Sequence, residues 1–155
     1  MFPVLRPILN KGGAGRYISR EESVERLQPI VANHLDLLQA YTATAARLSD
    51  PATRQRFDDV ILPNVRTELN KLYETVFSLG GSAPTGAGTD WDESAIDGDE
   101  ADRLRALIEM DKEFGETVSE EADAVHHQER TRAILMHNAA KSGERLTFLR
   151  GLVNN

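Results

Sequence analysis

The sequence predicts an all-α protein, a bundle of four helices arranged as two antiparallel hairpins. Three observations lead to this prediction. Apolar residues recur at alternating spacings of three and four in four segments, which is the period of a helix with one buried face. The segments follow each other closely within each half of the chain, and a long polar break separates the halves. Alternating β-branched runs, which would indicate strands, do not occur in the sequence.

Length and composition indicate a single domain and exclude several kinds of binding site and partner. A length of 155 residues suits one domain. The sequence has no cysteine, which excludes disulfides, Cys-ligated zinc, iron–sulfur clusters and thiol catalysis. The net charge of −7 argues against broad nucleic-acid binding, which needs a basic surface. Apolar runs are all shorter than the ~20 residues of a membrane helix. We therefore expect neither nucleic acid nor a membrane as a partner.

Residues 1–18 read as an N-terminal arm with a glycine-rich hinge, and residues 19–155 as the bundle domain. Met1–Leu9 is apolar, but it is short and broken by Pro3 and Pro7, so we expect no export signal and a cytoplasmic protein. Six apolar side chains within Met1–Leu9 have no helical or strand period. The arm therefore either packs on its own domain or docks on a partner subunit, and we expect a homodimer.

The first helix is expected to begin at Ser19, because Ser19 and Glu22 form a capping box. Pro29 should introduce a bend or a second start. The segment Ser49-Asp50-Pro51 predicts the end of the first helix and the start of the second, with a new N-cap and a proline at the first helical position. The apolar stripe between these points contains Val24, Leu27, Val31, His34, Leu38, Tyr41, Ala45 and Leu48.

The second helix should be kinked at Pro63 and should end before Gly80-Gly81. Its apolar face contains Phe57, Ile61, Val65, Glu68, Leu72, Val76 and Leu79. Residues 82–98 then form a break rich in Gly, Ala, Thr and Asp with a single large residue, Trp91. Such a length is uncommon between adjacent antiparallel helices, so we expect it to cross from one end of the bundle to the other.

The third helix should be capped by Asp97 or Asp99, and the turn to the fourth helix should lie near His126-His127-Gln128. The third stripe contains Leu104, Ile108, Asp111, Gly115, Val118, Ala122 and Val125, and the fourth contains Ile134, Leu135, Asn138, Ser142, Leu146, Leu149 and Val153. Two hairpins joined by one long connection form the ferritin-like type of four-helix bundle.

Each apolar stripe contains a polar residue near its middle: His34, Glu68, Asp111, and Asn138 with Ser142. A buried carboxylate is costly unless it is paired or bound to a metal. These residues could satisfy one another, together with Lys141, as a hydrogen-bonded polar core layer. Alternatively, His34, Glu68 and Asp111 are candidate ligands for iron or manganese, although the Glu-x-x-His pattern of di-iron bundles is missing from the second and fourth helices. Exposure to solvent is the third alternative.

Several short segments resemble a bacterial ferritin-like family without an established function. They are Tyr41-Thr42-Ala43, Leu48-Ser49-Asp50-Pro51, Leu79-Gly80-Gly81 and the Asp90-Trp91 pair of the crossover. The resemblance implies a ferritin-like fold, a bacterial cytoplasmic protein and a stress-related role. It also implies a degraded di-iron ligand set. The positions that would carry ligands hold Gln39, Asn64 or Glu68, Glu109 or Glu113, and Gly143 or Glu144.

Three functions are compatible with these features. The first is a non-enzymatic bundle that acts through self-association or a protein partner, and it needs no cofactor. The second is an iron- or manganese-binding oxidase or storage protein. The third is a metal-dependent transferase with three histidines, for which His34, His126 and His127 do not obviously converge. The sequence contains neither a nucleophile–base pair nor a glycine-rich phosphate loop, so we predict no catalytic residues.

Overall fold

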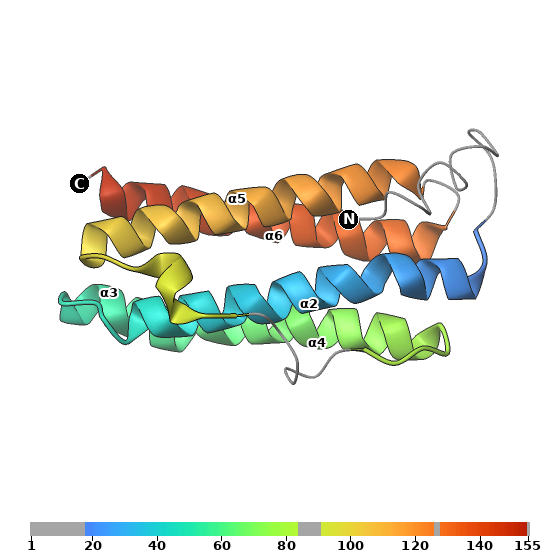
Figure 1. Ribbon diagram of the computed structural model, residues 1–155, viewed down its shortest axis with the longest axis horizontal. Coiled ribbons are helices and arrows are strands. Elements are labelled where there is room, and N and C mark those ends of the chain that lie inside the picture. The colour runs from blue at the N-terminus through green and yellow to red at the C-terminus, as the bar shows by residue number, and fades with distance from the viewer. Residues whose placement is uncertain (1–17, 84–90, 126–127, 155) are drawn as a thin grey trace.

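The computed structural model describes residues 18–83, 91–125 and 128–154, and it shows an elongated bundle of long helices (Figure 1). Among these residues there is no strand. The predicted all-α, ferritin-like four-helix bundle is confirmed. The elements in chain order are α2 (Arg20–Ala45), α3 (Pro51–Arg56), the π-helix η1 (Phe57–Ile61), α4 (Leu62–Ser78), the 3-10 helix η2 (Glu93–Ile96), α5 (Glu100–Ala124) and α6 (Glu129–Val153).

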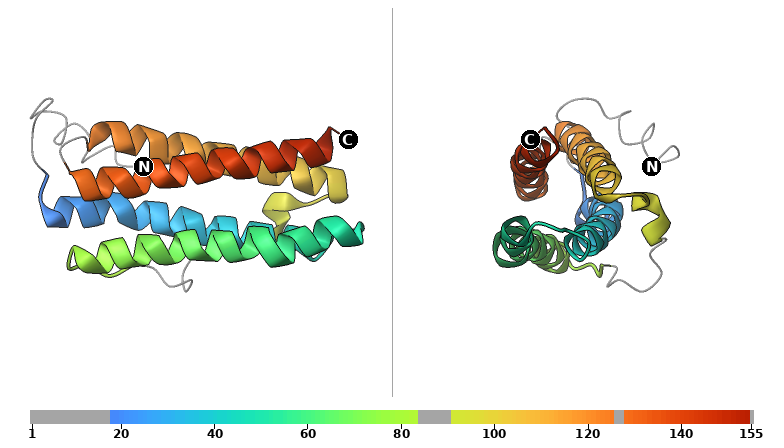
Figure 2. Two further views of the ribbon diagram at one scale, coloured as in Figure 1. Left: turned by 180° about the vertical axis from the view of Figure 1, so that it is seen from behind. Right: turned by 90° about the vertical axis from the view of Figure 1, so that its left-hand side faces the viewer.

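The four helical arms form two antiparallel hairpins. One consists of α2 and the continuous α3–η1–α4 arm, and the other of α5 and α6 (Figures 1 and 2). α4 ends at one end of the bundle and α5 begins at the opposite end, so the connection between the hairpins spans the bundle, as the sequence predicted. The part of this connection at residues 84–90 lies outside the described residues. Ile96 of η2 is buried and anchors the described part on the core.

Side-chain caps mark where α2, α3 and α5 begin. Ser19 Oγ accepts a hydrogen bond from the Glu22 backbone N–H at 3.1 Å, as its sequence signature predicted. The carboxylate of Asp50 accepts from the Thr53 backbone N–H at 2.9 Å. Of the two aspartates proposed for α5, Asp99 is the cap, and it forms a reciprocal capping box with Asp102.

The end of α4 depends on a glycine. Gly80 has a φ of +85°, a left-handed conformation that side chains with a Cβ rarely adopt. This conformation turns the chain so that the Gly81 N–H donates to the carbonyl of Val76 at 3.0 Å, which closes the last turn of the helix.

The two internal prolines are accommodated within helical segments. α2 runs without interruption through Pro29, so no second helix starts there. Pro63 is preceded by the π-helical turn Phe57–Ile61. Because proline has no N–H and its ring clashes with the carbonyl four residues earlier, a locally wider turn accommodates it within one continuous arm.

The core is continuous along the bundle and involves all four arms. Where α5 meets α6, the two helices approach closely at Gly115. A Cβ added to Gly115 would lie 2.7 Å from Ser142 Oγ, which is closer than carbon and oxygen can pack. The glycine therefore fixes how near α6 can come to α5.

The N-terminal arm expected at residues 1–18 lies outside the described residues except for Ile18. Ile18 is buried, and its carbonyl accepts a hydrogen bond from Gln128 Nε2 at 2.5 Å, which ties the entry of α2 to the start of α6. Within the described part of the chain, no helix is both long enough and apolar enough to cross a membrane.

We predict opposite effects for two glycine substitutions. Gly115→Ala should destabilise the protein by roughly 1–3 kcal/mol, because its methyl group collides with Ser142. Gly143→Ala, in α6 with no atom within 4 Å of the added Cβ, should stabilise it by about 0.5–1 kcal/mol. Urea unfolding followed by circular dichroism measures both. Equal effects of the two substitutions would show that α5 and α6 are not in close contact at Gly115.

Candidate functional site

The polar residue of α5, Asp111, is completely buried and is the centre of a hydrogen-bonded cluster. Arg145 donates to both carboxylate oxygens, through Nε at 2.7 Å and Nη2 at 2.9 Å. Ser142 Oγ lies 2.7 Å from Oδ1, and Tyr41 Oη donates to Oδ2 at 2.5 Å. The cluster therefore joins α2, α5 and α6 through one carboxylate.

The protonation states in this cluster follow from its burial and charges. Burial, and then the negative charge of Asp111, raises the pKa of Tyr41 well above its ordinary value, so the phenol keeps its proton and donates. Burial alone would lower the pKa of Arg145, but the hydrogen bonds and charge of Asp111 raise it. The Arg145 guanidinium also lies over the Tyr41 ring, 5.8 Å from its centroid. Arg145 is therefore a permanent internal cation.

Glu68, the polar residue on the apolar stripe of α4, lies in a group of side chains separate from the Asp111 cluster. It is buried, with 3% of its surface exposed, which confirms the burial expected from its place on the apolar stripe. Its carboxylate forms an ion pair with His137 of α6, and Lys71 Nζ lies 3.5 Å from its other oxygen. Glu68 therefore links α4 to α6, and among the described residues no hydrogen bond or ion pair joins it to Asp111.

The remaining predicted positions make fewer polar contacts. Asn138 is buried and donates from Nδ2 to the carbonyl of Ile134 in its own helix, while its Oδ1 has no partner among the described residues. His34 is fully buried, and neither of its ring nitrogens has a hydrogen-bond partner in the described part of the chain. The Phe114 ring lies edge-on to the imidazole with centroids 5.3 Å apart. Both residues remain in the core, but they do not join the Asp111 cluster by hydrogen bonds.

The expected contribution of Lys141 to the polar layer is wrong. Lys141 pairs with Glu144 at 3.2 Å on the surface, and Arg145, one residue beyond Glu144, takes the internal position. The reason is helical rotation, since Arg145 is three residues after Ser142 and seven after Asn138 and so shares their face. The repeat of Asn138, Ser142, Arg145 and Leu149 could have revealed it in the sequence.

A second buried ion pair was not anticipated. Arg26 of α2 donates to Glu121 of α5 at 2.7 Å, and both side chains are nearly inaccessible. The apolar stripe pattern assigned neither residue to the core, because each lies beside the stripe and not on it. The nearest sequence signal is their position next to the apolar residues Leu27 and Ala122.

The donor set does not fit a metal centre of the kind built in ferritin-like bundles, where carboxylates and histidines from facing helices converge. Among the described residues, no three His, Asp or Glu side chains gather in a group that could hold a metal ion. Asp111 is occupied by Arg145, Glu121 by Arg26, and Glu68 by His137. Asp111 and Glu121 therefore have guanidinium partners supplied by the chain, and in the described part of the chain the cation nearest to Glu68 is Lys71. His126 and His127 lie outside the described residues.

We predict that breaking the Asp111 pair is costly, whereas replacing it is not. Arg145→Met should destabilise the protein by roughly 3–5 kcal/mol, because it leaves a buried charge without a cation. The double variant Asp111→Leu/Arg145→Met should recover most of that loss. Lys141→Met, which removes an exposed pair in the same helix, should cost less than about 1 kcal/mol. Chemical unfolding of the unsubstituted chain and the three variants gives their unfolding free energies. A near-neutral effect of Arg145→Met would contradict the prediction that breaking the pair is costly.

We further predict a pH dependence that originates from His34. Burial, and then the charge of Arg145, lowers the pKa of His34 from 6.5 to about 4, while Asp111 opposes the shift. The unfolded chain therefore binds a proton more readily, and stability falls as the pH drops through 6.5 towards 4. Between pH 7 and pH 5 this amounts to about 2 kcal/mol.

The variant His34→Leu isolates this contribution, because the acidic groups titrate in both proteins. The unfolding free energy of the native chain should drop more steeply between pH 7 and pH 5 than that of the variant. Parallel pH profiles would show that His34 is not a buried neutral imidazole.

Comparison with known proteins supports the fold. No protein-family model matches the chain, and no curated protein matches its sequence. Among solved structures, the chain is similar to a mutant of Dps1 from Mycobacterium smegmatis, with a TM-score of 0.76 and 17% sequence identity. The match covers 86% of this chain and 96% of that chain. At this identity the likeness shows the fold alone, a ferritin-like four-helix bundle.

Proposed function

We propose that this protein is a non-enzymatic, ferritin-like bundle that acts through self-association or through a protein partner. The single observation that supports this proposal most is the pairing of the buried carboxylates Asp111, Glu121 and Glu68 with arginine or lysine side chains of the chain itself. A bundle with such a core has its charges neutralised without a metal. We then expect its contacts with other molecules to be made by surface side chains.

The family resemblance adds a context to this proposal. It favours a bacterial cytoplasmic protein with a stress-related role. We propose a homodimer as the simplest closed assembly. The N-terminal segment Met1–Leu9 is the proposed contact, since each apolar side chain that it buries on a partner contributes roughly 1.5–3 kcal/mol before ordering costs.

We expect light scattering to find a dimer for the intact chain and a weaker or absent dimer for a chain that starts at Arg16. The physical reason is the loss of the apolar segment, with the bundle itself left complete. Circular dichroism of the shortened chain is the control for folding. A monomer in both cases would refute self-association through the arm.

Elemental analysis of the purified protein separates this proposal from the metal-binding alternative. We expect substoichiometric iron and manganese, because the core carboxylates have internal cations. A stoichiometric amount of either metal would instead favour an oxidase or storage protein.

A further inference from the structure

We propose that the groove between α2 and α5 receives the N-terminal segment Met1–Leu9 of a second copy of this chain. The inference rests on the proposed function, since it names the surface through which the copies associate. It is carried by the chemistry of the groove, the composition of the segment and the position at which the segment leaves the bundle.

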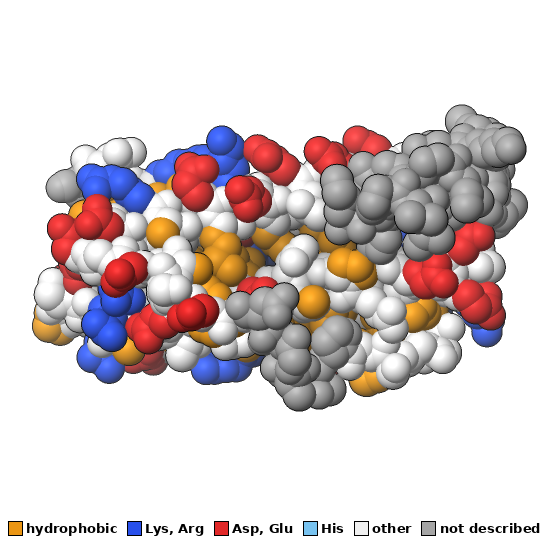
Figure 3. Space-filling view, viewed as in Figure 1, with side chains coloured by type: hydrophobic (Ala, Val, Ile, Leu, Met, Phe, Trp, Pro, Cys, Tyr) orange, Lys and Arg blue, Asp and Glu red, His pale blue; other side chains and the backbone are white. Residues whose placement is uncertain are grey.

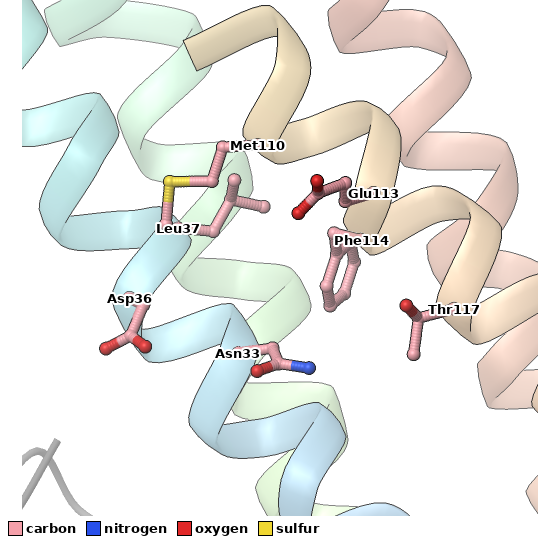
Figure 4. A pocket seen from close by; sticks show the side chains of 7 residues that line it. All are labelled: Asn33, Asp36, Leu37, Met110, Glu113, Phe114 and Thr117. Carbon is pink, nitrogen blue, oxygen red and sulfur yellow. The ribbon is translucent and has the colours of Figure 1, made fainter. Parts of the chain in front are cut away.

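The groove is apolar at its base and acidic at its rim. It has a volume of about 180 Å³ and lies midway along the bundle. Leu37 of α2 and Met110 and Phe114 of α5 form the apolar part, while Asp36 and Glu113 provide carboxylates. Figure 4 shows the Phe114 ring and the Glu113 carboxylate directed into the space between the two helices. Figure 3 shows hydrophobic side chains along the seam between α5 and α2, with acidic side chains nearby.

The N-terminal segment has the complementary composition. Residues 1–17 contain Arg6, Lys11 and Arg16 and have no acidic residue. Six of the first nine side chains are those of Met, Phe, Val, Leu and Ile. An apolar strip with cations fits a groove with an apolar base and a carboxylate rim.

Three other grooves on the described part of the chain suit this segment less well. The two between the α3–η1–α4 arm and α6 contain cations, namely Arg56, Lys141 and Arg145 in one and Lys71 and Arg130 in the other. The groove between α5 and α6 contains Arg132 opposite Asp123. Of these four grooves, the one between α2 and α5 combines carboxylates with the absence of a lysine or arginine.

The segment is long enough to reach this groove. Ile18 is held at the end of the bundle by Gln128, and Asn33 at the edge of the groove is thirteen residues beyond the start of α2, a rise of about 20 Å. Residues 10–17 can span up to about 26–29 Å when extended. A segment leaving one copy can therefore reach the middle of a second bundle that lies alongside it. The same length reaches the groove of its own chain, and the experiment below separates the two arrangements.

The absence of cysteine in the sequence permits a direct test by disulfide cross-linking. A tagged chain with Leu5→Cys is mixed with an untagged chain with Thr117→Cys, whose exposed side chain lies at the groove. The control partner carries Ala133→Cys, an exposed position in a groove between α4 and α6. We expect at least about fivefold more covalent heterodimer with Thr117→Cys than with the control.

The outcomes distinguish this inference from the proposed function. Equal yields with both partners would overturn the groove as the docking surface. A link within a single chain carrying both Leu5→Cys and Thr117→Cys, without heterodimer, would overturn docking on a second copy. If the dimer weakens on truncation yet Thr117→Cys gives no link, self-association remains and the groove is refuted. A monomeric intact chain would refute both.

A charge exchange tests the recognition itself. Glu113→Lys and Arg6→Glu should each weaken the dimer about tenfold in sedimentation experiments, since each affects two symmetric contacts. Combining them should restore most of the affinity. Glu74→Lys, the same charge change on exposed α4, is the matched control and should leave the dimer unchanged. Additive losses in the double variant would contradict a contact between the segment and the groove.

Discussion

The buried ion pair between Asp111 and Arg145 is the interaction on which the arrangement of the bundle depends. Removing two charges from water is unfavourable unless their geometry is good and additional hydrogen bonds satisfy the remaining atoms. Here Arg145 binds in a bidentate manner, and Tyr41 and Ser142 supply the further donors. Each donor comes from α2 or α6, so the carboxylate is satisfied only when the three helices share one register.

The close approach at Gly115 is a condition for this ion pair. Ser142 Oγ donates to the Asp111 carboxylate at 2.7 Å, and the same atom occupies the space that a Cβ at Gly115 would need. A side chain at Gly115 would therefore move Ser142 away from Asp111 as well as separate the helices. Packing and charge satisfaction are coupled at this point, which explains why a glycine lies in the middle of a long helix despite its low helix propensity.

Much of the fold could be predicted from the sequence, because helical period, caps and the long polar break are local signals. The burial of Glu68 and Asp111 followed from the same stripes. The ion-pair partners of these two carboxylates could not be predicted, because a pairing between helices depends on the rotation and register of both helices, which a single apolar stripe does not define. For this reason the sequence pattern indicated Lys141 as the internal cation, whereas the structure has Arg145 in that position. The Arg26–Glu121 pair could not be predicted, because both residues lie beside the apolar stripes.

The way the core charges are neutralised bears on what the protein can do. A guanidinium is always present and keeps its charge across the physiological pH range, so Asp111 does not depend on a metal supply. His34 is the exception within this core, because acid favours its charged form only when the chain unfolds. Because the buried carboxylates Asp111 and Glu121 are paired with arginines of the chain, the proposed function places the contacts with other molecules on the surface of the bundle. There the groove between α2 and α5 combines apolar side chains with the carboxylates of Asp36 and Glu113, a composition that favours binding of a basic, apolar segment.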